Sequence, residues 1–152
     1  MEISMLCSEL ADKARKEGIF RYSTGAIVAD NENNVLLIER SAKDSFAGQY
    51  EVPGGKVEEG EKIDEAVGRE LEEEAGLKIE KILAFVGSFD YVSSKGILTR
   101  QFNFQVALIG TDVRLSDEHV NYVWAGREEI RKYKINNELR DMLYSFWISE
   151  EK

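Results

Sequence analysis

Four of the five residues from Glu70 to Glu74 are glutamates. The apolar residues around them recur at helical spacing, which predicts a helix over residues 62–75. On a helical wheel of about 100° per residue, Glu70 and Glu74 fall in the middle of the apolar face. Glu73 falls at the edge of that face, and Glu72 faces solvent. The sequence therefore predicts three carboxylates on a face that should be buried.

This placement is electrostatically unfavourable unless a cation is present. A buried, unpaired carboxylate costs several kcal/mol or becomes protonated. Negative charge near a helix C-terminus, here predicted at Gly76, is unfavourable by about 0.3–1 kcal/mol per group. A hard divalent cation such as Mg²⁺ would offset both costs, because it binds carboxylate oxygens and keeps waters for phosphates. The alternative is a solvated, acid-rich helix face.

Two glycines precede the predicted helix and follow a short predicted strand. Gly54 and Gly55 allow a sharp turn and a close approach of the backbone to a ligand. An ordinary tight turn would need the same residues. Arg69 lies next to the glutamates, where it could either orient one of them or form a surface salt bridge.

The spacing of these residues resembles a known family pattern. Gly55, Glu61 and the run from Arg69 to Leu77 match the Nudix box, G-x5-E-x7-R-E-U-x-E-E-x-G-U, in which U is a bulky aliphatic residue. Every fixed position is met. The match spans residues 55–77, and the whole chain is therefore interpreted as resembling a Nudix hydrolase.

The resemblance implies roles for the box residues. The metal, Mg²⁺ or Mn²⁺, would be held by the carbonyl of Gly55 and by Glu70, Glu73 and Glu74. Catalytic roles would fall on Glu70 or Glu73 as the base and on Arg69, which is expected to pair with a box glutamate. Glu61 would support the metal-bound waters.

Residues outside the box give weaker signals. The run from Ser116 to Trp124 is similar to one found in many Nudix enzymes, including dinucleoside tetraphosphate hydrolases. That similarity implies that Glu118 is a further metal ligand or the base. His119, the only histidine, is expected to be a hydrogen-bonded structural residue.

Three residues are expected to bind substrate. Arg40 could reach a phosphate by bidentate hydrogen bonding or could be a solvated strand-end arginine. Gly54 would lie against the ligand. The resemblance implies that Asn137 faces a purine edge, although an N-cap role for Asn136 or Asn137 explains the sequence equally well. Aromatic residues could stack on a base or pack in the core: Phe46, Tyr50 and Phe89.

The elements that must position these residues form a mixed α/β or α+β fold, the Nudix fold of a mixed β-sheet between helices. Helices are predicted at residues 3–16 and near the C-terminus, where Leu139, Met142, Leu143 and Phe146 recur at helical spacing. Residues 41–49 are predicted to be a loop. Strands are predicted at 20–29, 35–38, 50–52, 79–92, 98–109 and 120–124, the first two as a hairpin around the turn at 30–34.

Composition narrows the function. The chain has 152 residues, a formal net charge of −9 and one cysteine, so nothing requires an oxidising compartment. The acidic balance argues against a nucleic-acid polymer or a membrane surface as partner. We expect one domain over residues 1–152, with an N-terminal helical extension at 1–18, in the cytoplasm, as a monomer or homodimer.

The expected reaction is metal-dependent hydrolysis of a nucleoside diphosphate linked to another moiety. A nucleoside triphosphate or damaged dNTP, giving monophosphate and pyrophosphate, is the first choice of substrate. Dinucleoside polyphosphates and ADP-ribose are the alternatives within the enzyme class. A non-catalytic nucleotide-binding module is the alternative outside it.

Overall fold

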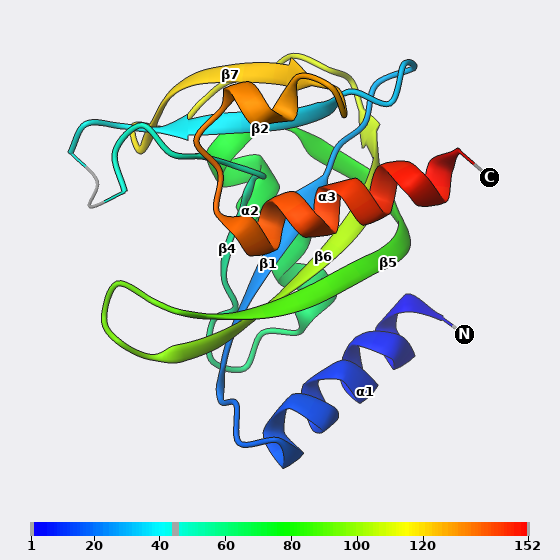
Figure 1. Ribbon diagram of the computed structural model, residues 1–152. Coiled ribbons are helices and arrows are strands. Elements are labelled where there is room, and N and C mark those ends of the chain that lie inside the picture. Colours follow the sequence, from blue (N-terminus) through cyan, green and yellow to red (C-terminus); the bar gives the residue numbers. More distant parts are fainter. Residues whose placement is uncertain (1, 44–45, 152) are drawn as a thin grey trace.

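The computed structural model describes residues 2–43 and 46–151, and Figure 1 shows their arrangement. The helices are α1 (Ile3–Lys16), α2 (Ile63–Ala75), the 3-10 turn η1 (Ile130–Lys132) and α3 (Asn137–Glu150). The strands are β1 (Arg21–Ile27), β2 (Val35–Arg40), β3 (Tyr50–Glu51), β4 (Gly54–Lys56), β5 (Lys78–Val92), β6 (Leu98–Ile109) and β7 (His119–Ala125). The architecture is α+β, as predicted.

The strands pair into two sheets. One has the order β4-β1-β6-β5 and is mixed, because β1 and β6 run parallel while the other pairs are antiparallel. The other has the order β3-β2-β7 and is antiparallel. Figure 1 shows α2 and α3 on opposite sides of β1 and β6.

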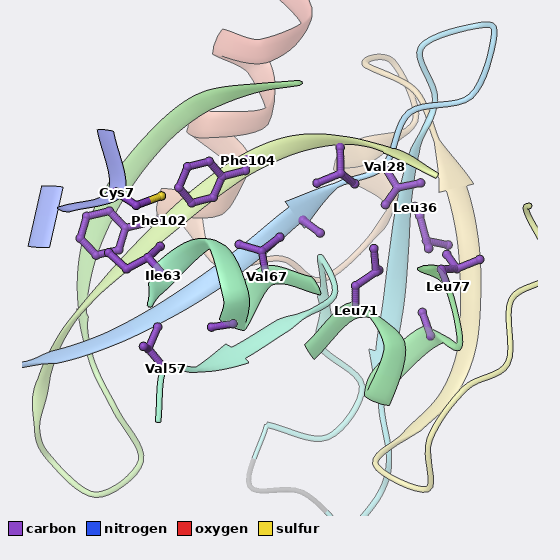
Figure 2. Close-up of a cluster of buried hydrophobic side chains, with 14 of the residues drawn as sticks. Cys7, Val28, Leu36, Val57, Ile63, Val67, Leu71, Leu77, Phe102 and Phe104 are labelled. Carbon is purple, nitrogen blue, oxygen red and sulfur yellow. The ribbon is translucent and has the colours of Figure 1, made fainter. Parts of the chain in front are cut away.

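Alternation along the central strands divides the core into two clusters. Ala26 of β1 packs with the α2 residues Val67 and Leu71, whereas its neighbour Ile27 packs with Leu143 of α3. Successive strand side chains point to opposite faces, so one strand supplies both clusters. Figure 2 shows the α2 cluster, which also includes Cys7 of α1.

Local sequence explains where α2 begins and ends. The side chain of Glu65 accepts a hydrogen bond of 3.0 Å from the backbone N–H of Lys62 at the start of the helix. Gly76 adopts φ 67° at its end, a left-handed conformation that favours glycine. The predicted helix at 62–75 is therefore confirmed. Its last turn carries no basic residue that would offset the negative charge there.

The predicted hairpin is confirmed only at its tip, where the backbone N–H of Asp30 donates to the carbonyl of Asn34 at 2.9 Å and that of Leu36 donates to the carbonyl of Val28 at 3.0 Å. Strands β1 and β2 lie in different sheets, and a single bridge between Ala29 and Val35 is their only ladder contact in the described residues. Strand β1 pairs with β4 and β6, which satisfy the backbone hydrogen-bonding groups at its two edges. The sequence prediction also missed β4, since its two glycines read as a turn.

The other predicted elements correspond to observed ones with small shifts of their ends. The predicted loop at 41–49 includes residues 44–45, which lie outside the described residues. None of the helices in the described ranges has the length and apolar character that a bilayer crossing requires.

Candidate active site

A cleft of about 560 Å³ lies where β4 and the end of α2 meet strands β1, β5 and β6. Both sheets contribute to it, since Glu51 belongs to β3 and Arg40 to β2. Its acidic lining residues are Glu51, Glu70, Glu73, Glu74, Asp117 and Glu118. The glutamates predicted from the helical wheel therefore meet acids from two other segments.

Glu74 is the most buried of the box glutamates, with 8% of its surface exposed. Its Oε1 accepts a hydrogen bond of 2.8 Å from the backbone N–H of Gly54. Burial raises the pKa of the Glu74 carboxyl to about 9, against the effect of that hydrogen bond. The carboxylates of Glu51, Glu70 and Glu118 raise it further. No basic side chain among the described residues forms an ion pair with Glu74.

Glu70 lies directly against the backbone of Gly55. A Cβ atom on Gly55 would stand 2.5 Å from the carboxyl carbon of Glu70, so only glycine leaves room for this contact. Burial raises the pKa of Glu70, and hydrogen bonding from Arg69 opposes the shift. The absence of a side chain at residue 55 thus brings its backbone to the acidic cluster.

Arg69 forms hydrogen bonds with three carboxylates but is not itself one of the residues that line the cleft. Its guanidinium donates to Glu61 at 2.7 and 3.0 Å, to Glu70 at 2.8 Å and to Glu73 at 3.1 Å. A further bond of 3.0 Å reaches the carbonyl of Lys56. The hydrogen bonds from Arg69 lower the pKa of Glu61. Arg69 therefore orients glutamates rather than facing the cleft itself.

Glu51 connects the cleft to the three-stranded sheet. Its carboxylate accepts a hydrogen bond of 3.0 Å from Nε of Arg40 and lies 2.9 Å from Nε2 of His119. His119 is buried, and its Nδ1 has no hydrogen-bond partner within the described part of the chain. The histidine is hydrogen-bonded, as expected from the sequence, but its partner belongs to the acidic cluster.

The remaining predicted residues are not all brought together. Glu118 and Gly54 line the cleft, while Glu61 supports it only through Arg69. Asn137 is exposed and is not among the cleft residues, whereas Asn136 is. The Asn136 side chain caps α3 by accepting a hydrogen bond of 2.7 Å from the N–H of Leu139. The N-cap interpretation is therefore confirmed for Asn136.

Among the aromatic candidates, Tyr50 packs against Tyr133 with ring centroids 4.9 Å apart, whereas Phe89 lines the cleft. The Phe46 ring lies under the guanidinium of Arg40, with 5.6 Å from the guanidinium carbon to the ring centroid.

Sequence reasoning missed Glu51 and the polar residues of β1 and β6 that line the cleft, namely Arg21, Ser23, Thr24 and Gln101. The polar–apolar alternation of residues 101–106 was the signal for Gln101. For Glu51 the only hint was a carboxylate one residue before Val52, which is buried.

The donor set fits a divalent cation. Glu51, Glu74 and His119 each offer a ligand atom, and these atoms lie within 4.8 Å of one another. Glu74 is buried, is surrounded by other carboxylates and has a raised pKa, so its ionised form needs a cation for stability. Carboxylate oxygens are the ligands that Mg²⁺ and Mn²⁺ prefer.

Comparisons with known proteins agree with this geometry. A family model described as NUDIX domain matches residues 19–146. The nucleoside triphosphatase NudI of Klebsiella pneumoniae is 30% identical over 118 residues, which cover 70% of this chain and 82% of that protein. The 8-oxo-dGTP diphosphatase of Escherichia coli is 52% identical over 48 residues, 31% of this chain and 37% of that protein.

Among solved structures, the MutT protein from Methanosarcina mazei Go1 superposes with a TM-score of 0.78 at 27% identity, covering 88% of this chain and 97% of that one. The box pattern, the acidic cleft and the match over most of the chain lead to one conclusion: this chain belongs to the Nudix family of pyrophosphohydrolases.

Proposed function

We propose that this chain hydrolyses a nucleoside triphosphate, including damaged dNTPs, to the monophosphate and pyrophosphate with Mg²⁺ or Mn²⁺. The observation that carries the proposal is Glu74, a buried carboxylate among other acids with no basic partner in the described residues. The likeness to a nucleoside triphosphatase and to an 8-oxo-dGTP diphosphatase supports the choice of substrate.

The chain's own residues divide the work. Glu70, Glu73, Glu74 and the carbonyl of Gly55 would hold the cation, which neutralises phosphate charge and lowers the pKa of a water. Basic residues that line the cleft would contact the other phosphate oxygens: Arg21, Arg40 and Lys56. This division explains how so acidic a chain binds a polyanion.

Glu118 is the residue that we assign as the base. Arg69 donates to both Glu70 and Glu73 and so occupies an oxygen of each carboxylate, whereas the exposed Glu118 lines the cleft without such a bond in the described residues. The carboxylate takes a proton from water as the oxygen bonds to phosphorus. The P–O bond that bridges the α- and β-phosphorus atoms breaks, and the leaving group, pyrophosphate after attack on the α-phosphorus or the monophosphate after attack on the β-phosphorus, keeps the electron pair.

A second cavity favours dinucleoside polyphosphates as the second candidate substrate. This cavity of about 680 Å³ shares Arg21 and Lys56 with the cleft and is also lined by Phe20, of which 73% is exposed. A phosphate chain bound to the two shared basic residues could extend a second base toward Phe20. The similarity of the Ser116–Trp124 run points the same way.

The wider setting of the proposal comes from the sequence. We propose one domain over residues 1–152 with residues 1–18 as a helical extension, acting in the cytoplasm as a monomer or homodimer. With a net charge of −9, its partners are nucleotide-type small molecules rather than a nucleic-acid polymer or a membrane.

Product analysis by liquid chromatography tests the proposal. The protein is incubated with Mg²⁺ and dNTPs, 8-oxo-dGTP, diadenosine tetraphosphate or ADP-ribose, each with an EDTA control. Metal-dependent monophosphate and pyrophosphate from a triphosphate is the expected result. Turnover of the dinucleotide or ADP-ribose alone would replace the substrate class, and binding without any product would favour the non-catalytic module.

A further inference from the structure

A row of polar side chains covers the face of the four-stranded sheet opposite α2. In the register of β1 and β6, Ser23 lies beside Gln101 and Gly25 beside Asn103. The intervening residues Phe102 and Phe104 face the α2 core instead. This polar face therefore forms one wall of the cleft, in which Gln101 is a lining residue.

Two amides on this face hold each other in a fixed orientation. The Asn103 Nδ2 donates to the carbonyl of Gly87 at 3.2 Å, and a carbonyl can only accept. The Asn103 Oδ1 must then accept, which it does from Nε2 of Gln101 at 2.7 Å. Because Asn103 is fully buried, its hydrogen bond with Gln101 fixes the orientation of the Gln101 amide.

Gly25 makes this arrangement possible. A Cβ at residue 25 would stand 2.2 Å from Oδ1 of Asn103 and 2.8 Å from Nε2 of Gln101. Any side chain there would displace both amides. The two hydrogen bonds that connect Gly87, Asn103 and Gln101 thus depend on a glycine in the neighbouring strand.

The fixed amide leaves an acceptor for a ligand. No described residue donates a hydrogen bond to Oε1 of Gln101, and this oxygen is not among the buried unpaired atoms. Gln101 also lines an adjoining recess of about 340 Å³, which shares Arg21, Arg40 and Tyr91 with the cleft. Aromatic rings of Phe46 and Tyr91 line this recess, which has the apolar surface that a nucleoside needs.

We propose that Gln101 is a specificity-determining residue that accepts a hydrogen bond from an N–H or O–H group of the substrate's nucleoside, and that Asn103 is the positioning residue that aims it. The inference rests on the proposed function only in taking the ligand to be a nucleotide. A pre-oriented acceptor discriminates because a nucleoside without the matching donor leaves it unpaired. The donor is a base N–H or a ribose hydroxyl.

The test is the binding of non-hydrolysable α,β-imido nucleoside triphosphates, measured by calorimetry with Mg²⁺. Four bases are compared, each as ribose and 2′-deoxyribose forms, in the wild type and in Gln101→Met, which keeps the length of the side chain but removes both polar groups. Gln105→Met is the matched control, because Gln105 follows on the same strand face but does not line the cleft. Asn103→Ser, which replaces the positioning amide with a shorter hydroxyl group, is the second variant.

We expect the wild type to bind some nucleosides more tightly than others. Gln101→Met should weaken binding of the preferred nucleosides by about tenfold, so that the difference in affinity between nucleosides becomes smaller. Asn103→Ser should reduce the same differences in affinity, and Gln105→Met should leave them unchanged. Loss of a base preference identifies a base N–H as the donor, and loss of the ribose preference identifies a hydroxyl.

Several results would overturn the inference: a wild type that binds no nucleotide, a wild type without preference, or an unchanged or uniformly weakened profile in Gln101→Met. Failure of the proposed function looks different. In that case the wild type releases no product from hydrolysable nucleotides, although its binding preference still depends on Gln101.

Discussion

The backbone N–H of Gly54 donates a hydrogen bond of 2.8 Å to the carboxylate of Glu74, which joins the start of β4 to the end of α2. This bond and the contact of Gly55 with Glu70 place two consecutive glycines against two box glutamates. These two glutamates of the acidic cluster are thus held between a helix and a strand rather than on exposed loops.

The stability of the metal-free protein should fall as pH rises. The folded-state pKa of Glu74, about 9, is raised above its ordinary value of 4.5, so folding favours the protonated carboxyl. Its contribution is fully present below pH 4.5 and is lost as the pH rises through about 9. Thermal unfolding in EDTA from pH 5 to 9 measures it. Glu74→Gln should flatten that decline, and an equally steep decline in the variant would contradict the assignment.

Arg69→Lys should lower kcat by about 10–100-fold with a smaller effect on KM, because lysine cannot hold three carboxylates with one planar fork. Steady-state kinetics with Mg²⁺ measures the effect. Arg15→Lys, at an exposed pair with Asp12, is the matched control and should have no effect. Wild-type kcat in Arg69→Lys would mean that the glutamates are oriented without the guanidinium.

Gly55→Ala should reduce kcat by about 10²-fold, because the new Cβ displaces the Glu70 carboxylate from a position 2.5 Å away. Gly68→Ala, on the helix that carries Glu70, provides the control, since its Cβ would meet nothing closer than 3.9 Å. The control should keep activity and gain about 0.5–1 kcal/mol of stability from helix propensity. Equal activities in the two variants would contradict the close contact at Gly55.

The sequence predicts those structural features that depend on neighbouring residues, and it does not predict contacts between distant segments. The box helix follows from apolar periodicity within 13 residues, and burial of Glu74 follows from its place on that wheel. The turn at 30–34 follows from a local signal and is observed, whereas the pairing of β1 with β6, more than 70 residues away, has no local signal and was not predicted. Glu51 and His119, 68 residues apart, meet for the same non-local reason.

The thiol of Cys7 should be almost unreactive in the native protein. Burial, and after it the charge of Asp64, raises its pKa to about 11, so little thiolate forms at pH 8. Labelling with a disulfide reagent at pH 8, with and without guanidinium, measures this protection. Slow native labelling and rapid labelling of the unfolded chain are expected. Rapid native labelling would mean that α1 does not stay packed on α2.

The central claim is that Glu74 serves a metal-dependent hydrolysis. The decisive measurement is the rate of pyrophosphate release with Mg²⁺ in Glu74→Gln, compared with Glu72→Gln at the exposed side of the same helix. The account predicts a loss of about 10²-fold or more in Glu74→Gln with unfolding at an equal or higher temperature, and no change in Glu72→Gln. Wild-type turnover by a folded Glu74→Gln protein would contradict it.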